Sequence, residues 1–141
     1  MRIVLDTNVI VSGLLNPSGA PAAVLNLVLR QSATLVVDNR ILFEYSDLLR
    51  KKKFAFPPHA IDALLDFARA SAQYVTAVQS RTKLPDDDDR PFYEVALSGS
   101  ADYLITGNKR HFPRKPFVVT PAQFLDIATE GMLHGERGSA Q

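Results

Sequence analysis

Acidic side chains, or an amide in the place of one, lie beside apolar runs at four separated points of the sequence. They are Asp6, Glu44, the aspartates at 86–89, and the pair Asp102 and Asn108. Two bare carboxylates ~4 Å apart repel by roughly 4 kcal/mol at an effective dielectric constant near 20, so a site that gathers them needs a cation. Oxygen donors without cysteine or clustered histidine favour Mg²⁺ or Mn²⁺. Such an ion activates water and stabilises the charge of a phosphodiester, as a hydrolytic nuclease requires.

Each of these residues also has an ordinary structural explanation, and the residues alone leave both open. Asp6 can start the turn after a strand, and Glu44 can be a solvated helix residue. The aspartates at 86–89 suit a solvated loop that ends in a helix N-cap, so at most one or two of them can face a single site. Asp102 and Asn108 are common turn residues. Three histidines show no ligand spacing, and we expect structural or surface roles for them: His59, His111 and His134.

Apolar runs alternate with amphipathic stretches, so we expect strands and helices to alternate. The expected strands span residues 3–5, 34–37, 74–78, 103–105 and 117–119, with 74–78 near an edge. The expected helices span residues 22–30, 40–52, 60–72, 91–98 and 121–127. This order predicts an α/β fold with a central parallel sheet of four to five strands flanked by helices. Ligands bind at the carboxyl ends of such strands, where Asp6 and Asn108 are expected.

Length and composition set further limits. The 141 residues fit one domain, which we expect at residues 1–130, followed by a disordered tail at 131–141. The absence of cysteine excludes disulfides, zinc–thiolate sites and thiol nucleophiles. No segment has the length of a membrane span, and the amino terminus lacks a signal-peptide pattern, so we expect a cytoplasmic protein. A net charge of +1 does not indicate nucleic-acid binding, which only a local basic patch would do.

Four fragments, taken in order, resemble the PIN domain, a small nuclease family that includes the VapC-type toxins of bacterial toxin–antitoxin modules. They are IVLDTN at 3–8, Glu44, DDRPFYEVA at 88–96, and ADYLITGNKRHF at 101–112. The resemblance covers the chain to about Thr129. It is greatest for a branch of toxin components that carries Arg-Pro-Phe in the helix after the third acid. It implies an α/β/α sandwich and a Mg²⁺- or Mn²⁺-dependent endoribonuclease with its acids at the carboxyl edge of the sheet.

The resemblance also implies roles for individual residues. Asp6, Glu44 and Asp89 match the family's first three acids and are expected to hold the metal. Asn108 stands at the fourth position of this catalytic set. Because its amide carries no charge, we expect weaker metal binding, with Asp102 as a further ligand. Residues expected to hydrogen-bond these ligands or a substrate phosphate are Thr7, Asn8, Thr106, Arg90 and Lys109. Other basic residues available to an RNA backbone are Arg40, Arg110, Arg114, Lys115 and those at 50–53.

Three functions stay open at this point. The first is an endoribonuclease toxin of a type II toxin–antitoxin module, for which the family implies an RNA substrate, a cognate antitoxin protein and a homodimer. The second, prompted by Asn108, is a catalytically weak PIN-like module that binds RNA or protein. The third is a phosphoacceptor domain like those of response regulators. It is disfavoured because it would need an acidic pair near the first strand end and a lysine after a late strand.

Overall fold

The apolar runs of the sequence form a five-stranded parallel sheet. The computed structural model describes residues 1–139, with side chains described as far as residue 131. The strands are β1 (Arg2–Leu5), β2 (Thr34–Val37), β3 (Gln73–Tyr74), β4 (Tyr103–Ile105) and β5 (Val118–Val119), in the order β3-β2-β1-β4-β5. Every neighbouring pair is parallel. The aliphatic side chains of β1 and β2 are buried, as expected of a sheet covered on both faces.

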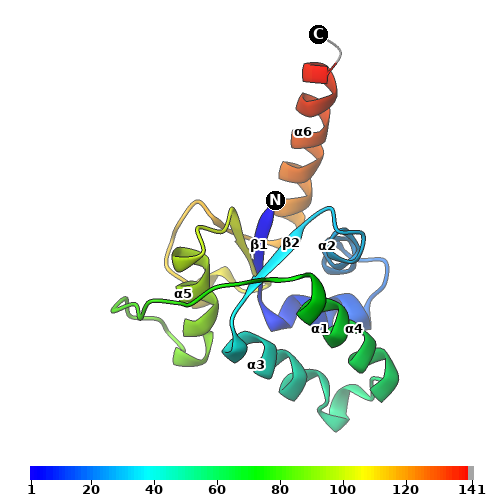
Figure 1. Cartoon of the computed structure of the whole chain (residues 1–141), viewed down its shortest axis with the longest axis vertical. Helices are drawn as coiled ribbons and strands as arrows, with labels where there is room; N and C mark the ends of the chain where they lie inside the picture. The colour runs from blue at the N-terminus through cyan, green and yellow to red at the C-terminus, as the bar shows by residue number, and fades with distance from the viewer. Residues whose placement is uncertain (140–141) are drawn as a thin grey trace.

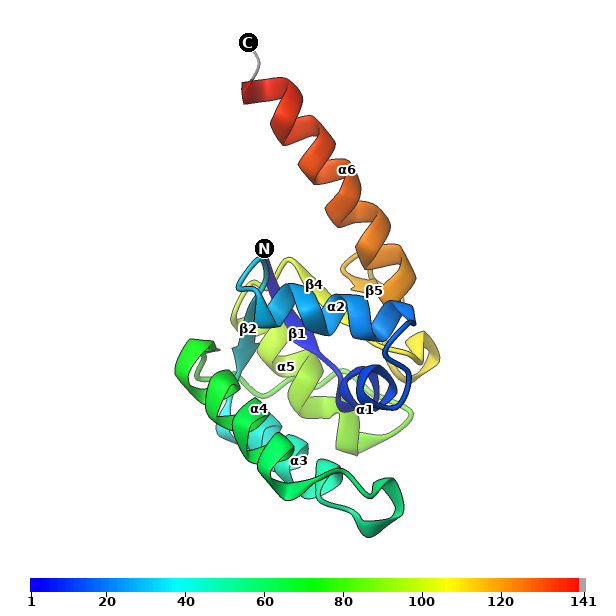
Figure 2. The ribbon, with the colours of Figure 1, turned by 90° about the vertical axis from the view of Figure 1, so that its right-hand side faces the viewer.

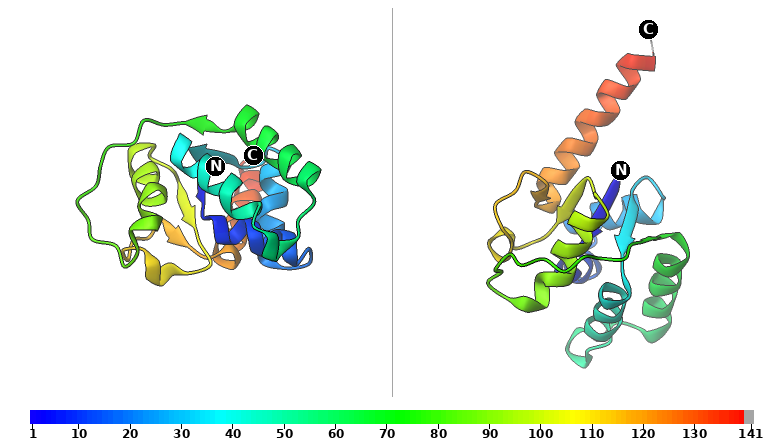
Figure 3. Two further views of the ribbon diagram at one scale, coloured as in Figure 1. Left: turned by 90° about the horizontal axis from the view of Figure 1, so that it is seen from below. Right: turned by 60° about the vertical axis from the view of Figure 1, so that its left-hand side comes forward.

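Helices cover both faces of the sheet (Figure 1). They are α1 (Thr7–Leu15), α2 (Ala20–Leu29), α3 (Asn39–Leu49), α4 (Pro58–Ser71), α5 (Arg90–Ser98) and α6 (Pro121–Ser139). Three short 3₁₀ helices are η1 (Lys52–Phe54), η2 (Asp87–Asp89) and η3 (Lys109–His111). Helix α5 packs against β1, β2 and β4, whereas α2 packs with α1 and α6. Figure 3 shows these two groups on opposite sides of the strands.

The order of the strands creates a crevice beside β1. From β1 the chain builds outward through β2 and β3, then returns to the other side of β1 with β4 and β5. The direction of winding therefore reverses between β1 and β4. In open parallel sheets the ligand site lies at the carboxyl ends of the strands next to this reversal. Asp6 and Thr106, which directly follow β1 and β4, lie there.

Two aromatic side chains position the helices around this crevice. The hydroxyl of Tyr45 on α3 donates a hydrogen bond to the carbonyl of Leu5, the last residue of β1. Its ring packs against Phe92 on α5, with 6.3 Å between the ring centroids. Both side chains are fully buried. The start of α5 and the middle of α3 are thereby held next to the end of β1, so the residues beside these aromatics share one site.

The structure confirms the predicted fold class and differs in three elements. Residues 7–15 form α1, which the sequence analysis does not predict. Its β-branched residues have modest helix propensity, and burial against α2 outweighs it. Strand β3 is an edge strand, as expected, but it is shorter than the expected 74–78 and starts one residue earlier.

The third difference concerns the end of the chain. Where the sequence analysis expects disorder from residue 131, α6 continues to Ser139, and only residues 140–141 lie outside the described residues. Its first turns are anchored by the buried Phe124, and a helix once started extends at one hydrogen bond per residue. The helix projects away from the sheet (Figure 2). Within the described chain, no helix combines the length and apolarity needed to cross a membrane.

Candidate metal centre

Asp6 lies where β1 ends and α1 begins, at the N-cap of α1. Its backbone amide donates to the carbonyl of Ile105 on β4 at 2.9 Å, which ties the end of β1 to the neighbouring strand. Its carboxylate Oδ2 accepts a hydrogen bond of 2.7 Å from the Thr106 hydroxyl. Only 5% of the residue is exposed. The carboxylate is therefore held rigidly at the reversal point of the sheet.

Burial makes the charge of Asp6 costly. Desolvation raises the pKa of this carboxyl group, and the charge of Asp89 raises it as well. Hydrogen bonds from Thr106 and from the amides of Asn8 and Thr7 act in the opposite direction. The balance raises the pKa from 3.8 to about 6. A cation bound here would favour the ionised form and offset the effects of both burial and repulsion.

Glu44 reaches the same edge of the sheet from α3. Asp38 caps the amino end of that helix, because its side chain accepts a hydrogen bond of 3.0 Å from the amide of Ile41. The hydroxyl of Thr7, the first residue of α1, donates a hydrogen bond to Glu44 Oε2. Partial burial raises the pKa of Glu44, the Thr7 hydrogen bond lowers it, and the charge of Asp6 raises it; the pKa is raised on balance. Glu44 and Asp6 therefore repel each other.

Of the aspartates at 86–89, Asp89 lies close enough to interact with both Asp6 and Glu44, and the charge of Asp88 also acts on Glu44. Asp86 caps η2 by accepting from the amide of Asp88 at 2.9 Å, and Asp87 pairs with Arg90 at 3.0 Å. Asp89 occupies the N-cap position of α5, as the sequence predicts, but its side chain caps no backbone amide. Burial raises its pKa, His111 lowers it, and the charges of Asp86 and Glu44 raise it; the pKa is raised on balance.

The oxygens of this site suit a hydrated divalent ion. Among the described side chains, no Lys or Arg pairs with Asp6, Glu44 or Asp89. Apart from a contact with His111, Asp89 Oδ2 is buried with no hydrogen-bond partner in the described residues. Among the described residues, no group of three His, Asp or Glu side chains is close enough together to hold an ion without other ligands. Because Mg²⁺ is commonly bound through one or two carboxylates and keeps several waters, an open set fits it.

His111 is a member of the site that the sequence analysis misses. Its Nδ1 lies 3.0 Å from Asp89 Oδ2, and its Nε2 lies 2.9 Å from the side-chain nitrogen of Asn108. If the Asn108 amide donates to Nε2, the proton of a neutral imidazole sits on Nδ1 and faces Asp89. The sequence offers one indication of this role, namely that His111 follows Asn108 by three residues, which is one turn of η3. Asn108 also donates its backbone amide to the Thr106 hydroxyl at 3.0 Å.

The remaining predicted residues divide into two groups. Thr7 and Thr106 contact Glu44 and Asp6 directly, as described above, and Asn8 accepts a hydrogen bond of 3.2 Å from the amide of Gly107. Arg90 turns away from the acids and donates to the carbonyl of Ser80 at 2.8 Å. The ammonium group of Lys109 lies 3.4 Å from the side-chain oxygen of Gln123 on α6, outside the acidic set.

The expectation that Asp102 acts as a further metal ligand needs correction. Asp102 precedes β4, whereas Asp6 follows β1, and the two strands are parallel with Ile3 opposite Tyr103. The two carboxylates therefore lie at opposite ends of these parallel strands. Asp102 instead accepts a hydrogen bond of 2.8 Å from the amide of Arg2.

Comparison with known proteins gives a family and one distant relative. The family described as PIN domain matches residues 2–110, a range that contains Asp6, Glu44, Asp89 and Asn108. The uncharacterized protein MJ1680 of Methanocaldococcus jannaschii is similar to this chain, with 28% identity over 112 residues. The aligned part covers 77% of this chain and 72% of the relative. No solved structure matches the chain.

Proposed function

The chain belongs to the PIN domain family, and from this premise we propose that it is a Mg²⁺- or Mn²⁺-dependent endoribonuclease. PIN domains are generally nucleases that bind nucleic acid and use divalent metals, so the family supports hydrolysis of phosphodiester bonds in broad terms. The finer proposal is that RNA is the substrate and that the protein is the toxin of a type II toxin–antitoxin module.

One observation carries the proposal. Three acids from three different elements converge beside β1, their pKa values are raised, and no described Lys or Arg side chain pairs with them. If these acids served stability alone, we would expect a basic partner beside each of them or an uncharged residue in its place, because a buried unpaired charge is destabilising. A removable cation explains why the acids are retained.

We assign the residues of the site the following roles. Asp6 and Asp89 would hold the ion, with Glu44 beside them. A bound divalent ion supplies Lewis acidity and lowers the pKa of its water. Thr106 and Thr7 orient the carboxylates of Asp6 and Glu44 by donating hydrogen bonds to them. His111 orients Asp89 from the other side of the site. These contacts restrict each carboxylate before the ion arrives, which reduces the entropy lost on binding.

The toxin role brings its own expectations. We expect a cytoplasmic protein that forms a homodimer and is inhibited by a cognate antitoxin protein. Expression of the wild-type chain in a bacterial host should arrest growth, and expression of the Asp6→Asn variant at the same level should not. A short reading frame beside the gene whose product relieves the arrest would support the antitoxin. Growth unaffected by an active nuclease would contradict the toxin role while leaving the hydrolase intact.

Asn108 favours a second candidate, a catalytically weak PIN-like module that binds RNA or protein. Its side-chain amide carries no charge and is already engaged with His111. On this alternative the native protein binds Mn²⁺ poorly, and Asn108→Asp creates metal binding. Ordinary Mn²⁺ affinity in the native protein would count against it.

The deciding experiment compares the same change, Asp to Asn, at opposite ends of the parallel strands. Cleavage of a labelled single-stranded RNA is followed in Mg²⁺, in Mn²⁺ and in EDTA for the wild type, Asp6→Asn, and Asp102→Asn as the matched control. Wild type should cleave only with a divalent ion. Asp6→Asn should lose at least about 100-fold in rate, because changes even to residues that merely orient metal ligands cost roughly 10–100-fold.

The control and the metal dependence make this test sharp. Asp102→Asn should cleave like the wild type, because Asp102 lies away from the site and bonds to the Arg2 amide. Cleavage that persists in EDTA, or that Asp6→Asn leaves unchanged, would overturn the mechanism. Equal loss in both variants would indicate a general effect on folding, which circular dichroism of the same samples would detect.

A further inference from the structure

The connection between β4 and β5, residues 106–117, concentrates positive charge in a nearly neutral chain. The sequence carries no Asp or Glu between Asp102 and Asp126. Within the connection lie four of the chain's 16 Lys and Arg residues: Lys109, Arg110, Arg114 and Lys115. The net charge of the whole chain is only +1, so this local concentration is not a consequence of overall composition.

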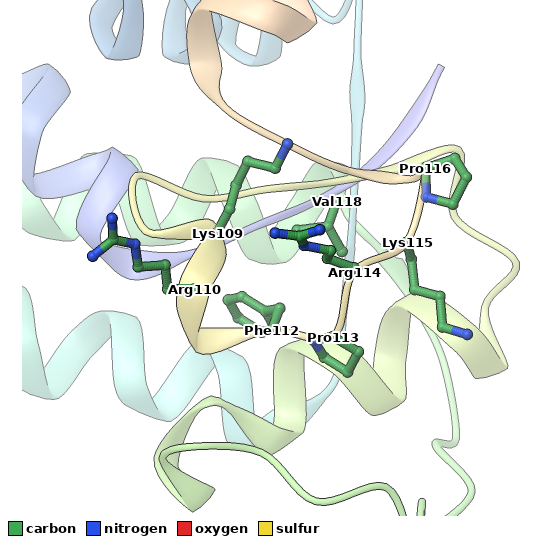
Figure 4. A pocket seen from close by; sticks show the side chains of 8 residues that line it. All are labelled: Lys109, Arg110, Phe112, Pro113, Arg114, Lys115, Pro116 and Val118. Atoms are coloured by element: carbon green, nitrogen blue, oxygen red, sulfur yellow. The ribbon is translucent and has the colours of Figure 1, made fainter.

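These four cations surround an open hollow of about 780 Å³. Figure 4 shows their side chains fanning out from the connection, with Phe112, Pro113, Pro116 and Val118 between them. All four cationic residues are exposed. In the described part of the chain none of them forms an ion pair, and Lys109 has only the long contact with Gln123. We call this feature the basic hollow.

The backbone that carries the basic hollow is well anchored. Phe112 is 5% exposed and Val118 is 2% exposed, so both side chains are fixed in the core. The amide of Val118 donates to the carbonyl of Lys115 at 3.0 Å, and the amide of Leu104 on β4 donates to the carbonyl of Phe117 at 2.8 Å. The cations therefore project from an ordered support.

The basic hollow begins where the acidic site ends. His111, between Arg110 and Phe112, faces Asp89, and Asn108, before Lys109, donates its amide to Thr106. The same short segment thus contacts the acids with one side and lines the hollow with the other. A strand whose phosphate lies at the acidic site would meet these cations as it continues.

We propose that the basic hollow binds the phosphodiester backbone of the RNA strand next to the bond that is cut. This inference rests on the proposed function in taking RNA as the ligand. Exposed Lys and Arg without acidic partners match phosphates, whose contacts position a nucleic acid without reading its sequence. Phe112 is buried and presents no ring for a base to stack on, so the binding should depend little on base identity.

The lining argues against an acidic protein segment as the occupant. Stable protein interfaces depend on buried aromatic or aliphatic anchors that fit pockets in the partner. Here the larger apolar side chains of the lining, Phe112 and Val118, are already buried in the chain's own core. Besides two prolines, the hollow offers a partner four exposed cationic side chains, which suit a polyanionic backbone.

The test measures RNA binding apart from cleavage. Fluorescence anisotropy of a labelled single-stranded RNA is recorded in EDTA over a range of salt concentrations. The variant Arg114→Gln/Lys115→Gln removes two charges from the hollow. The matched control Arg30→Gln/Arg69→Gln removes two exposed charges at the ends of α2 and α4, which lead into the amino ends of β2 and β3.

Each phosphate contact on a single strand contributes about 0.7 to the slope of log affinity against log salt. The hollow variant should therefore lower the slope by about 1.4 and the affinity by roughly 25-fold at about 0.1 M salt, equally for oligo(U) and oligo(A). The control should bind like the wild type. In Mg²⁺, the hollow variant should raise the KM for a long RNA and leave its kcat unchanged.

Several outcomes separate this inference from the proposed function. Equal slopes for both double variants and the wild type would overturn the inference even if Asp6→Asn abolishes cleavage. RNA binding through the hollow without any cleavage by the wild type would support the inference while the proposed function failed. Binding of a polyglutamate peptide as tight as that of RNA, lost in the same variant, would reassign the hollow to an acidic protein partner.

Discussion

Glu94 and Asp6 are buried to nearly the same extent, with 2% and 5% exposed. Their pKa values are nevertheless shifted in opposite directions. The carboxylate of Glu94 on α5 accepts hydrogen bonds from Arg40 Nη1 at 2.8 Å and from the Ser80 amide at 2.6 Å. Burial alone would raise its pKa, but the hydrogen bonds from Ser80 and Arg40 lower it on balance. Asp6 has a hydroxyl and backbone amides near it but no Lys or Arg partner among the described residues, and its pKa is raised.

This difference separates an acid that has its counterion within the fold from the acid on which the proposed metal site is based. The Arg40–Glu94 pair supplies a permanent counterion, which also joins the start of α3 to α5 and to the segment before η2. The site around Asp6 omits that counterion and leaves Asp89 Oδ2 poorly partnered. Burial or the count of acids alone would not distinguish the two. What distinguishes them is the source of the neutralising charge, which is Arg40 for Glu94 and, under the proposed function, a bound cation for Asp6.

The sharpest test of this contrast is the stability of Asp6→Asn as a function of pH. The native carboxyl keeps its proton up to about pH 6, whereas the unfolded one loses it near 3.8. Between these values the native state binds more protons, so the free energy of unfolding falls as pH rises. The change in pKa corresponds to about 3 kcal/mol. In EDTA, Asp6→Asn should be more stable than the wild type by up to about 3 kcal/mol at pH 7, and equally stable near pH 4.

Urea unfolding in EDTA at the two pH values measures this directly. Mn²⁺ should raise the Tm of the wild type, because it binds the ionised site, and leave that of Asp6→Asn unchanged. A variant that is destabilised at pH 7, or a difference that does not depend on pH, would contradict the view that Asp6 is a costly charge awaiting a cation.

The converse test removes the counterion of the structural acid. Arg40→Gln leaves Glu94 buried without its cation, and the free energy of unfolding should fall by about 1.5–3 kcal/mol, as for a lost hydrogen bond to a charged group. The rise in Tm produced by Mn²⁺ should be the same as in the wild type, because Arg40 does not contact the acids around Asp6. Loss of that Mn²⁺ response in a folded Arg40→Gln protein would show that the two regions are not independent.

The smallest expected effect concerns His111. His111→Ala removes the group beside Asp89 Oδ2 and the partner of the Asn108 amide, so cleavage should fall by about 10-fold, as for residues that orient a metal ligand. His111→Gln can still donate a hydrogen bond and should restore part of the rate. The His111 side chain is 42% exposed, so Tm should change little. Equal rates in Ala and Gln variants would indicate that His111 does not position Asp89.

The sequence predicts the sheet and most of the helices because their signals are local. Short apolar runs mark β1, β2 and β4, and a polar residue follows each of them at the carboxyl end of the sheet. The same logic explains the positions of Asp6 and Thr106, whereas Asp89 takes the expected N-cap position of α5. Helix α1 is missed because burial against α2, a tertiary effect, outweighs the modest propensity of its residues.

The partners of the acids could not be predicted in the same way. Glu94 meets Arg40 across 54 positions of sequence, and Thr7 meets Glu44 across 37. Asp102 and Asn108 are only six positions apart in the sequence. Strand β4 lies between them, so the two residues are at opposite ends of that strand. His111 has no ligand spacing to the other histidines, and its partner Asp89 comes from another element.

By itself, the sequence determined the α/β order of the elements, the PIN resemblance and three of the acids at the carboxyl end of the sheet, Asp6, Glu44 and Asp89. Only the tertiary structure decided which acids have a basic partner among the described residues and which do not. Element identity depends on residues a few positions apart, whereas the charge state of a buried carboxylate depends on what the fold brings to within hydrogen-bonding distance.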